Sequence, residues 1–378
     1  MVEKEMKKFI LGGPDSQQVA RTRLVSALVE NRFPQAVLIE GARGIGKKAL
    51  AISLMQTLSC TDGEASPCGK CMGCKMAMNP GNVGAWVVPL ETAEANAKSA
   101  SEVSGTSRAK TVEEYKAEYV ARILENPYSV NIFSGISQIS VDQIRSMTSQ
   151  FSKASETVRV VIIAEADRMN DAAANALLKT LEEVPSNTYF ILTSSNGGRL
   201  LQTIRSRCLT LRLPSLSDGE VSEISSRVFH EKLSPDALGM SLGSPGVASL
   251  YNENIAENET LAFDFLRDSV EGNYSDLFFE LDGAFPKGPA AVDSAVMMLD
   301  IVAFLVADAI RIAGDRPVRL PDMRENLAAL NLGRFGAEAL EKAILEISKA
   351  SEKIASRKNS VIVAFETLSI GLLEGFKK

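Results

Sequence analysis

Apolar positions along the first 213 residues fall into short runs that alternate with helical patterns. Three runs are almost wholly apolar and too short for helices, which is typical of strands buried on both faces. They are residues 36–39, 159–164 and 189–193, and a fourth run at 209–213 alternates apolar with polar residues. Helical patterns cover residues 17–31, 47–58, 139–152 and 170–183. Strands that alternate with helices predict a parallel α/β sheet.

The pattern changes after Pro214, where a polar run at 215–218 marks a boundary. Beyond Gly219 helical patterns dominate and strand candidates are few. We therefore expect an α/β domain over residues 1–214, a small helical domain over 215–254 and a larger helical domain over 255–378. Residues from about 89 to 137 are predicted to form a surface insertion in the first domain, with a helix at 111–124.

The composition is that of a globular chain. Of its 378 residues, 45% are hydrophobic and 23% are charged, and two or three domains are expected at this length. The net charge of −6 argues against a stand-alone nucleic-acid binder, whose binding face is usually basic. We find neither an apolar run of about 20 residues nor a signal-peptide pattern, so we expect a cytoplasmic protein without a membrane partner.

A phosphate-binding loop is predicted at residues 41–48, GARGIGKK, between the first strand and the next helix. Gly41, Gly44 and Gly46 let backbone N–H groups turn toward a phosphate, and Lys47 would reach the terminal phosphates. The last position of the motif normally carries a Ser or Thr hydroxyl that ligates magnesium. Here it is Lys48, whose ammonium has no lone pair to give and repels a cation. The loop can therefore hold an anion, but its metal shell is incomplete.

Hydrolysis at such a loop also needs an acidic pair at the end of a buried strand. One carboxylate organises the magnesium and the other polarises the attacking water. The segment VVIIAEAD at 160–167 has Ala164 at the metal-side position and keeps Glu165. Glu165 is either the remaining acid of this pair or a solvated residue at a strand end. With Lys48, two metal contacts are missing, so efficient hydrolysis is not expected.

Four of the five cysteines cluster as C-x7-C-x2-C-x2-C, and this spacing is typical of a structural zinc module. They are Cys60, Cys68, Cys71 and Cys74. Disulfides or free thiols are the alternative, but an odd number of cysteines in a cytosolic chain is poor material for a disulfide framework. The fifth cysteine, Cys208, is predicted to stay outside the site.

Together these features resemble one family, the bacterial sliding-clamp loader subunits of the gamma/tau and delta-prime types. Besides the loop and the cysteine module, three stretches carry the resemblance: NALLKTLEEVP at 175–185, TIRSRC at 203–208 and NSVIVAFETL at 359–368. The resemblance is detailed from about Gln17 to Leu213 and weaker beyond. It implies an AAA+ architecture, in which a RecA-like domain with an inserted zinc module precedes a small helical lid and an all-helical collar domain.

The resemblance also implies roles and partners. Arg207, in the family's Ser-Arg-Cys motif, corresponds to an arginine finger that enters the nucleotide site of a neighbouring subunit. Ser194 or Ser195 falls in the region of the nucleotide-sensing residue after the third strand. The implied assembly is a hetero-pentamer with gamma/tau and delta subunits, which loads the sliding clamp on primed DNA for DNA polymerase III.

Three positions depart from the motor subunits of this family. Lys48 and Ala164 are two of them, and the third is Gly246, which stands where the lid motif Gly-Ser-x-Arg has its arginine. These departures favour the delta-prime type, a stator that lends its finger without hydrolysing ATP; ATP binding itself is left open. The alternatives are a hydrolysing gamma/tau-type motor and, from another class, a zinc-dependent nucleic-acid-binding protein. The resemblance assigns no role to the insertion.

Overall fold

The computed structural model describes residues 8–62, 65–97, 110–130, 132–133, 137–151, 155–253, 255–274, 277, 281, 283–285, 290–355 and 360–376. The chain forms two compact units: residues 1–230 with 243–247, and residues 231–242 with 248–378. The expected division into three domains stays a prediction. Residues 98–109 of the predicted insertion, and Asn359 of the terminal motif, lie outside the described residues.

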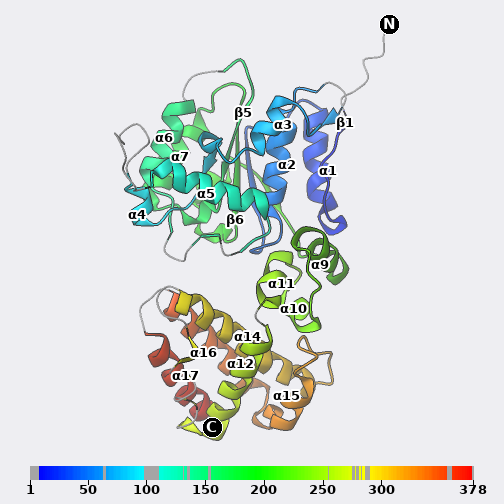
Figure 1. The fold of residues 1–378 in the computed structure, drawn as a ribbon, viewed down its shortest axis with the longest axis vertical. Coiled ribbons are helices and arrows are strands. Elements are labelled where there is room, and N and C mark those ends of the chain that lie inside the picture. Colours follow the sequence, from blue (N-terminus) through cyan, green and yellow to red (C-terminus); the bar gives the residue numbers. More distant parts are fainter. Residues whose placement is uncertain are drawn as a thin grey trace. The chain divides into compact units, whose positions relative to one another are not determined.

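The first unit is built on a parallel sheet of five strands, as the sequence predicts. The strand order is β4 (Trp86–Val87), β5 (Arg159–Ile163), β6 (Thr188–Ser194), β2 (Ala36–Glu40) and β7 (Leu209–Arg212). Every pairing within this sheet is parallel. Helices lie on both sides of it (Figure 1), which explains why its strands are apolar on both faces.

The predicted strands and helices of this unit are confirmed to within a few residues at their ends. The helices are α1 (Gln18–Val29), α2 (Lys47–Ser59), α3 (Met72–Ala77), α4 (Thr92–Ala95), α5 (Val112–Glu125), α6 (Val141–Phe151), α7 (Asp171–Glu182), α8 (Gln202–Arg205) and α9 (Asp218–Ile224). Single turns of 3-10 helix occur at Asp15–Gln17, Val83–Ala85, Ala166–Arg168 and Gly197–Arg199, and a π-helical turn at Ser225–Phe229.

Three short strands escaped the sequence analysis. β4 is only two residues long, and β1 (Lys8–Phe9) pairs in parallel with β3 (Ala65–Ser66) in a small separate sheet. Two residues are too few to show an alternating pattern, so only the position of a partner strand reveals them.

One part of the core of the first unit lies between the sheet and helices α6 and α7. All five residues of β2 are buried, and the apolar face of α7 contributes Ala173, Leu177 and Leu181 to the same cluster. Each fully buried aliphatic side chain of this kind stabilises the fold by about 1.5–3 kcal/mol. The packed sheet is therefore a firm support for the loops that follow its strands.

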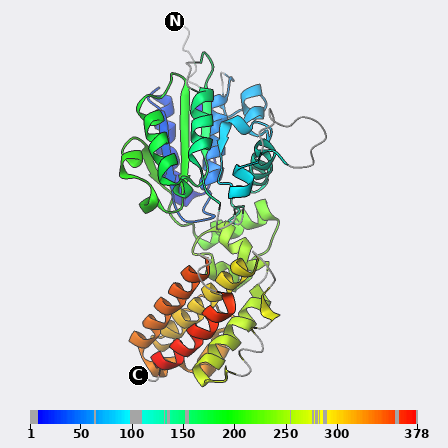
Figure 2. The same ribbon diagram turned by 90° about the vertical axis from the view of Figure 1, so that its left-hand side faces the viewer.

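The secondary structure of the second unit consists of helices alone in its described residues, as predicted for the C-terminal part. Its helices are α10 (Pro235–Met240), α11 (Pro245–Asn252, whose first residues belong to the first unit), α12 (Ile255–Glu271), α14 (Ala290–Ala313), α15 (Arg324–Leu330), α16 (Ala337–Ala355) and α17 (Val361–Phe376), with a 3-10 turn at Leu332–Phe335. Figure 2 shows α14, α16 and α17 side by side. Among the described helices, none has the length and apolar character of a membrane span.

Two buried carboxyl groups interact inside the helical unit. Asp236 is 1% exposed and Glu259 is 8% exposed, and an oxygen of Asp236 accepts a hydrogen bond from the Asp322 amide. Burial raises the pKa of both groups, and that of Glu259 rises to about 8. The pair therefore keeps a proton at neutral pH, because two ionised carboxylates cannot share a buried site.

Replacing Glu259 with glutamine is expected to stabilise the helical unit in alkaline solution. A carboxyl whose pKa is raised by folding contributes full stability below its ordinary pKa near 4.5, and loses it as the pH rises through about 8. The neutral amide never has to ionise, so Glu259→Gln should raise the melting temperature at pH 9 by a few degrees and have less effect at pH 5. Thermal unfolding at both pH values, with the exposed Glu338→Gln as control, tests this. An identical pH dependence in wild type and Glu259→Gln would contradict it.

Candidate nucleotide-binding and cysteine sites

Three neighbouring strands deliver the predicted site residues to one edge of the sheet. The loop at 41–48 follows β2, Glu165 follows β5, and Ser195 follows β6. Because β5, β6 and β2 are adjacent and parallel, their carboxyl ends meet where open α/β sheets bind ligands. Gly46 begins α2 with a φ of 103°, a left-handed conformation that glycine adopts without strain.

The ammonium of Lys47 is fully engaged by the protein itself. Its Nζ donates to the carbonyl oxygens of Gly41 (2.9 Å) and Ala42 (2.6 Å) and to the hydroxyl of Ser195 (2.9 Å). Burial, with help from the neighbouring Lys48 charge, lowers the pKa of Lys47 to about 8. The serine that reaches the loop is thus Ser195, whereas the Ser194 hydroxyl accepts from the Asn196 amide at 3.2 Å.

Lys48 points into the site and pairs with the acid that remains there. Its Nζ lies 3.4 Å from one oxygen of Glu165, and the other oxygen of Glu165 lies 2.7 Å from Nε of Arg168. Burial lowers the pKa of Lys48, and the Glu165 charge opposes that shift. Both oxygens of Glu165 are therefore bound to cations, so this carboxylate is poorly placed to activate water.

A segment from the end of the predicted insertion lies over the loop. The Val130 carbonyl accepts from Nη2 of Arg43 at 2.9 Å, and the Ser129 carbonyl accepts from Nζ of Lys48 at 3.2 Å. The ring of Tyr128 packs on Gly46, where an added Cβ would lie 2.8 Å from its Cε1 atom. The insertion thus contacts the site directly, which the sequence analysis did not foresee.

Gly246 is the fourth contact of the segment that contains Tyr128. Its amide donates to the Gly44 carbonyl at 3.2 Å, and a Cβ at position 246 would lie only 1.9 Å from the carbonyl oxygen of Tyr128. The neighbouring Ser244 hydroxyl donates to the Arg43 carbonyl at 2.6 Å. Position 246 therefore cannot carry the arginine of motor subunits while Tyr128 stays where it is.

Arg207 lies apart from this site, just after α8. Its Nη2 is 2.7 Å from a carboxylate oxygen of Glu182 at the end of α7, and its Nη1 donates to the Thr203 carbonyl at 3.1 Å. The side chain is 35% exposed. The adjacent Cys208 instead packs against the core between the sheet and α7, and burial raises the pKa of its thiol to about 11. Within the Ser-Arg-Cys motif, Cys208 thus packs against the core, whereas the Arg207 guanidinium lies at the surface.

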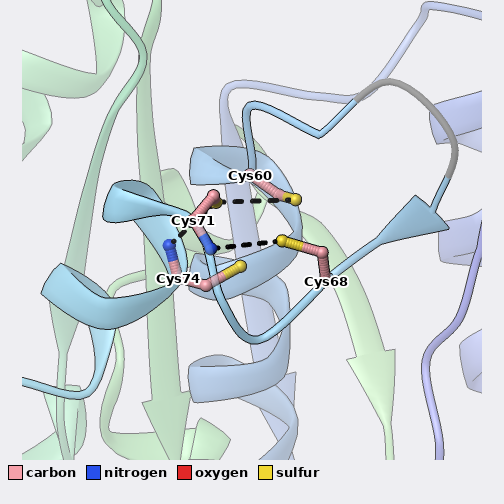
Figure 3. A group of neighbouring side chains, drawn as sticks. All are labelled: Cys60, Cys68, Cys71 and Cys74. Atoms are coloured by element: carbon pink, nitrogen blue, oxygen red, sulfur yellow. Dashed lines mark hydrogen bonds between the residues drawn. The ribbon is translucent and has the colours of Figure 1, made fainter.

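The four clustered cysteines come together as the spacing predicts (Figure 3). The sulfur atoms of Cys60, Cys68, Cys71 and Cys74 all lie within 4.8 Å of one another. Amides donate to two of them, from Cys71 to the Cys68 sulfur at 3.4 Å and from Cys74 to the Cys71 sulfur at 3.5 Å. The Cys74 amide lowers the pKa of the Cys71 thiol.

This sulfur cluster fits one tetrahedral metal ion. Four sulfurs bonded to zinc at about 2.3 Å lie about 3.8 Å from one another, and Cys60 and Cys71 already have their sulfurs 3.9 Å apart. The Cys74 N–H directed at the Cys71 sulfur favours the thiolate form of that residue, which is the form that metals bind. A Cβ at Gly73 would lie 1.8 Å from the Ser59 carbonyl, so the turn between Cys71 and Cys74 packs tightly on the end of α2.

Comparisons with known proteins place the chain in a family. The family model described as "DNA polymerase III, delta subunit" matches residues 16–217. The chain belongs to this family. Its relatives identify it as a delta-prime type: it is 30% identical to the delta' subunit of Escherichia coli over 63% of this chain and 61% of that protein. The delta' subunit of Bacillus subtilis is 28% identical over 56% of this chain and 51% of the relative.

The matched region of the family contains the loop, the cysteine cluster, Glu165 and Arg207, but ends before Gly246. The chain spans less than two thirds of the length of these delta' relatives. Among solved structures, a gamma subunit-related protein of DNA polymerase III from Thermotoga maritima aligns with 96% of this chain and 99% of its own, at 12% identity and a TM-score of 0.45.

Sequence reasoning missed two participants in the nucleotide site. Arg168 binds Glu165 but lies five residues beyond the end of β5. From the sequence alone it cannot be distinguished from a surface arginine. Tyr128 and its neighbours lie in a stretch that composition marks as surface loop. A faint signal was present, since Tyr128, Val130 and Phe133 are apolar or aromatic residues directly after the end of α5.

Proposed function

We propose that this chain is the stator-like subunit of a DNA polymerase III clamp loader. It would bind gamma/tau-type and delta-type subunits in a hetero-pentamer and help to place the sliding clamp on primed DNA in the cytoplasm. It would not hydrolyse ATP itself. Arg207 would act as an arginine finger on the nucleotide site of the neighbouring subunit.

The observation that carries this proposal is the ion pair between Lys48 and Glu165, whose atoms are 3.4 Å apart. In a hydrolysing site, the hydroxyl at position 48 and an acid at position 164 would hold magnesium, and Glu165 would be free. Here a buried ammonium replaces the hydroxyl, and position 164 is an alanine with 0% exposure. A cation site whose centre faces a protein cation cannot retain Mg²⁺. Relatives of this chain are named delta' and tau/gamma subunits of DNA polymerase III, and these names support the proposed assembly.

The cysteine cluster is proposed to hold one structural zinc ion. Four thiolates form a closed shell with no open position for substrate, which is the pattern of structural rather than catalytic zinc. Zinc would fix the turn between β3 and α3 against the end of α2.

The isolated chain is expected to show no ATP turnover above background. The physical reason is the missing magnesium shell together with the neutralised Glu165. Phosphate release from purified protein with MgATP measures it, and Glu165→Gln provides the control, because it should leave the same background. A turnover near the typical enzyme value of about 10 s⁻¹, abolished by Glu165→Gln, would instead identify a hydrolysing gamma/tau-type motor.

A further inference from the structure

The loop that follows α5 has four large side chains that are buried like those of a core. Tyr128 and Val130 are each 8% exposed, Ile132 is 4% exposed and Phe133 is 6% exposed. An ordinary surface loop has no reason to bury four large side chains within six positions. The described part of this loop, residues 126–130 with 132 and 133, is called the covering segment below.

We propose that the covering segment is a built-in ligand that occupies this chain's own nucleotide site and closes it to ATP. The inference rests on the proposed function in one respect, because it treats the loop at 41–48 as a former nucleotide site. It goes further in stating what fills that site and in giving the insertion a role.

Peptide carbonyl groups of the covering segment bind two cations of the site. The Val130 carbonyl accepts from the Arg43 guanidinium, and the Ser129 carbonyl accepts from the Lys48 ammonium. Lys48 is 7% exposed, so its charge needs such partners, and it finds two more in Glu165 and in the Phe133 ring, whose centroid lies 5.5 Å from Nζ. The cations of Arg43 and Lys48 are thus satisfied without a bound anion.

The Tyr128 ring is the aromatic part of the covering segment that contacts the phosphate loop. It packs on Gly46 at the start of α2, and its centroid lies 6.4 Å from that of Phe229. The Tyr128 carbonyl is in contact with Gly246, which in turn is hydrogen-bonded to Gly44. One residue therefore connects the phosphate loop with the 243–247 segment.

This arrangement explains why the departures occur together. Gly246 leaves room for the Tyr128 carbonyl, Lys48 binds the Ser129 carbonyl, and Ala164 adds no second acid at the end of β5. It follows that restoring the magnesium contacts alone, by Lys48→Thr with Ala164→Asp, should not restore ATP binding. The covering segment has to be displaced as well.

The test is the melting temperature of the full chain with and without millimolar MgATP. We expect no ATP-dependent shift for wild type or for Lys48→Thr/Ala164→Asp. Adding Tyr128→Ala and Phe133→Ala to that double variant should produce a shift of several degrees, because ligand that binds only the folded state stabilises it. Adding Tyr115→Ala instead is the matched control, since Tyr115 is also an aromatic residue of the insertion but contacts Lys110 rather than the loop, and should produce none.

Hydrogen exchange on the unmodified chain gives a second measurement that does not depend on how the variants fold. The amides of residues 128–130 should be protected without nucleotide, and MgATP should not change their exchange. The proposal is overturned if ATP stabilises wild type or the double variant, or if these amides exchange freely. Either result would leave the stator role standing, because that role is tested separately by assembly and by Arg207 in a reconstituted loader.

Discussion

Replacing Arg207 with alanine is expected to lower the clamp- and DNA-stimulated ATPase of a reconstituted loader and to lower clamp loading with it. An arginine finger stabilises charge that develops on the transferred phosphoryl group, and is worth about 10³–10⁵ in rate at the one site it serves. The other sites of a ring keep their own fingers, so total ATPase should fall by roughly the share of that single site. Clamp loading should fall further, because loading requires ATP hydrolysis at that site.

The variant should not disturb the fold of this chain. Arg207 is partly exposed, and its ion pair with Glu182 lies at the surface, where such pairs contribute about 0–1 kcal/mol. Arg207→Lys should not rescue activity, because a flexible point charge lacks the planar fork of donors. Arg32→Ala is the control, since it removes another exposed arginine that is paired with an acid. Wild-type rates for both Arg207 variants in an assembled complex would refute the role in trans.

Replacing Cys71 with serine is expected to remove the metal from the cysteine cluster. Structural zinc in small modules binds with about 10–16 kcal/mol, so the loss of one of four thiolates should be the largest local destabilisation available to a single substitution here. Wild type should carry one zinc per chain, the variant much less, and its melting temperature should fall. Chelator should lower the melting temperature of wild type in the same way.

Elemental analysis of protein purified under reducing conditions measures the zinc content directly. The matched control is Cys208→Ser, which changes the fifth cysteine. Cys208 packs against the core and not against the cluster, so this variant should keep its zinc whatever happens to its stability. Zinc near zero in wild type, or unchanged in Cys71→Ser, would contradict the proposed centre.

Local patterns in the sequence predict most of the first unit. The strands β2, β5 and β6 are short apolar runs, and the helices between them have apolar residues at helical spacing, so both follow from burial alone. The cysteine spacing likewise predicts a cluster, because C-x2-C turns present two sulfurs to one point. These features depend on residues close together in the chain.

Contacts between distant residues could not be predicted in the same way. Lys48 and Glu165 are 117 positions apart, and their pairing depends on adjacent strands ending at the same edge of the sheet. The covering segment reaches the loop from more than 80 positions away, and nothing in its composition states which surface it covers. The choice between Ser194 and Ser195 also required the structure, because a strand end can direct either hydroxyl toward the loop.

The proposal that this chain is a clamp-loader subunit is tested most directly by the mass of a reconstituted complex. The chain, with a mass of 40.7 kDa, is mixed with gamma/tau-type and delta-type subunits and weighed by native mass spectrometry. We predict a hetero-pentamer whose mass includes this chain together with both partner types. A spectrum in which the 40.7 kDa chain stays free while the partners assemble without it would contradict the account.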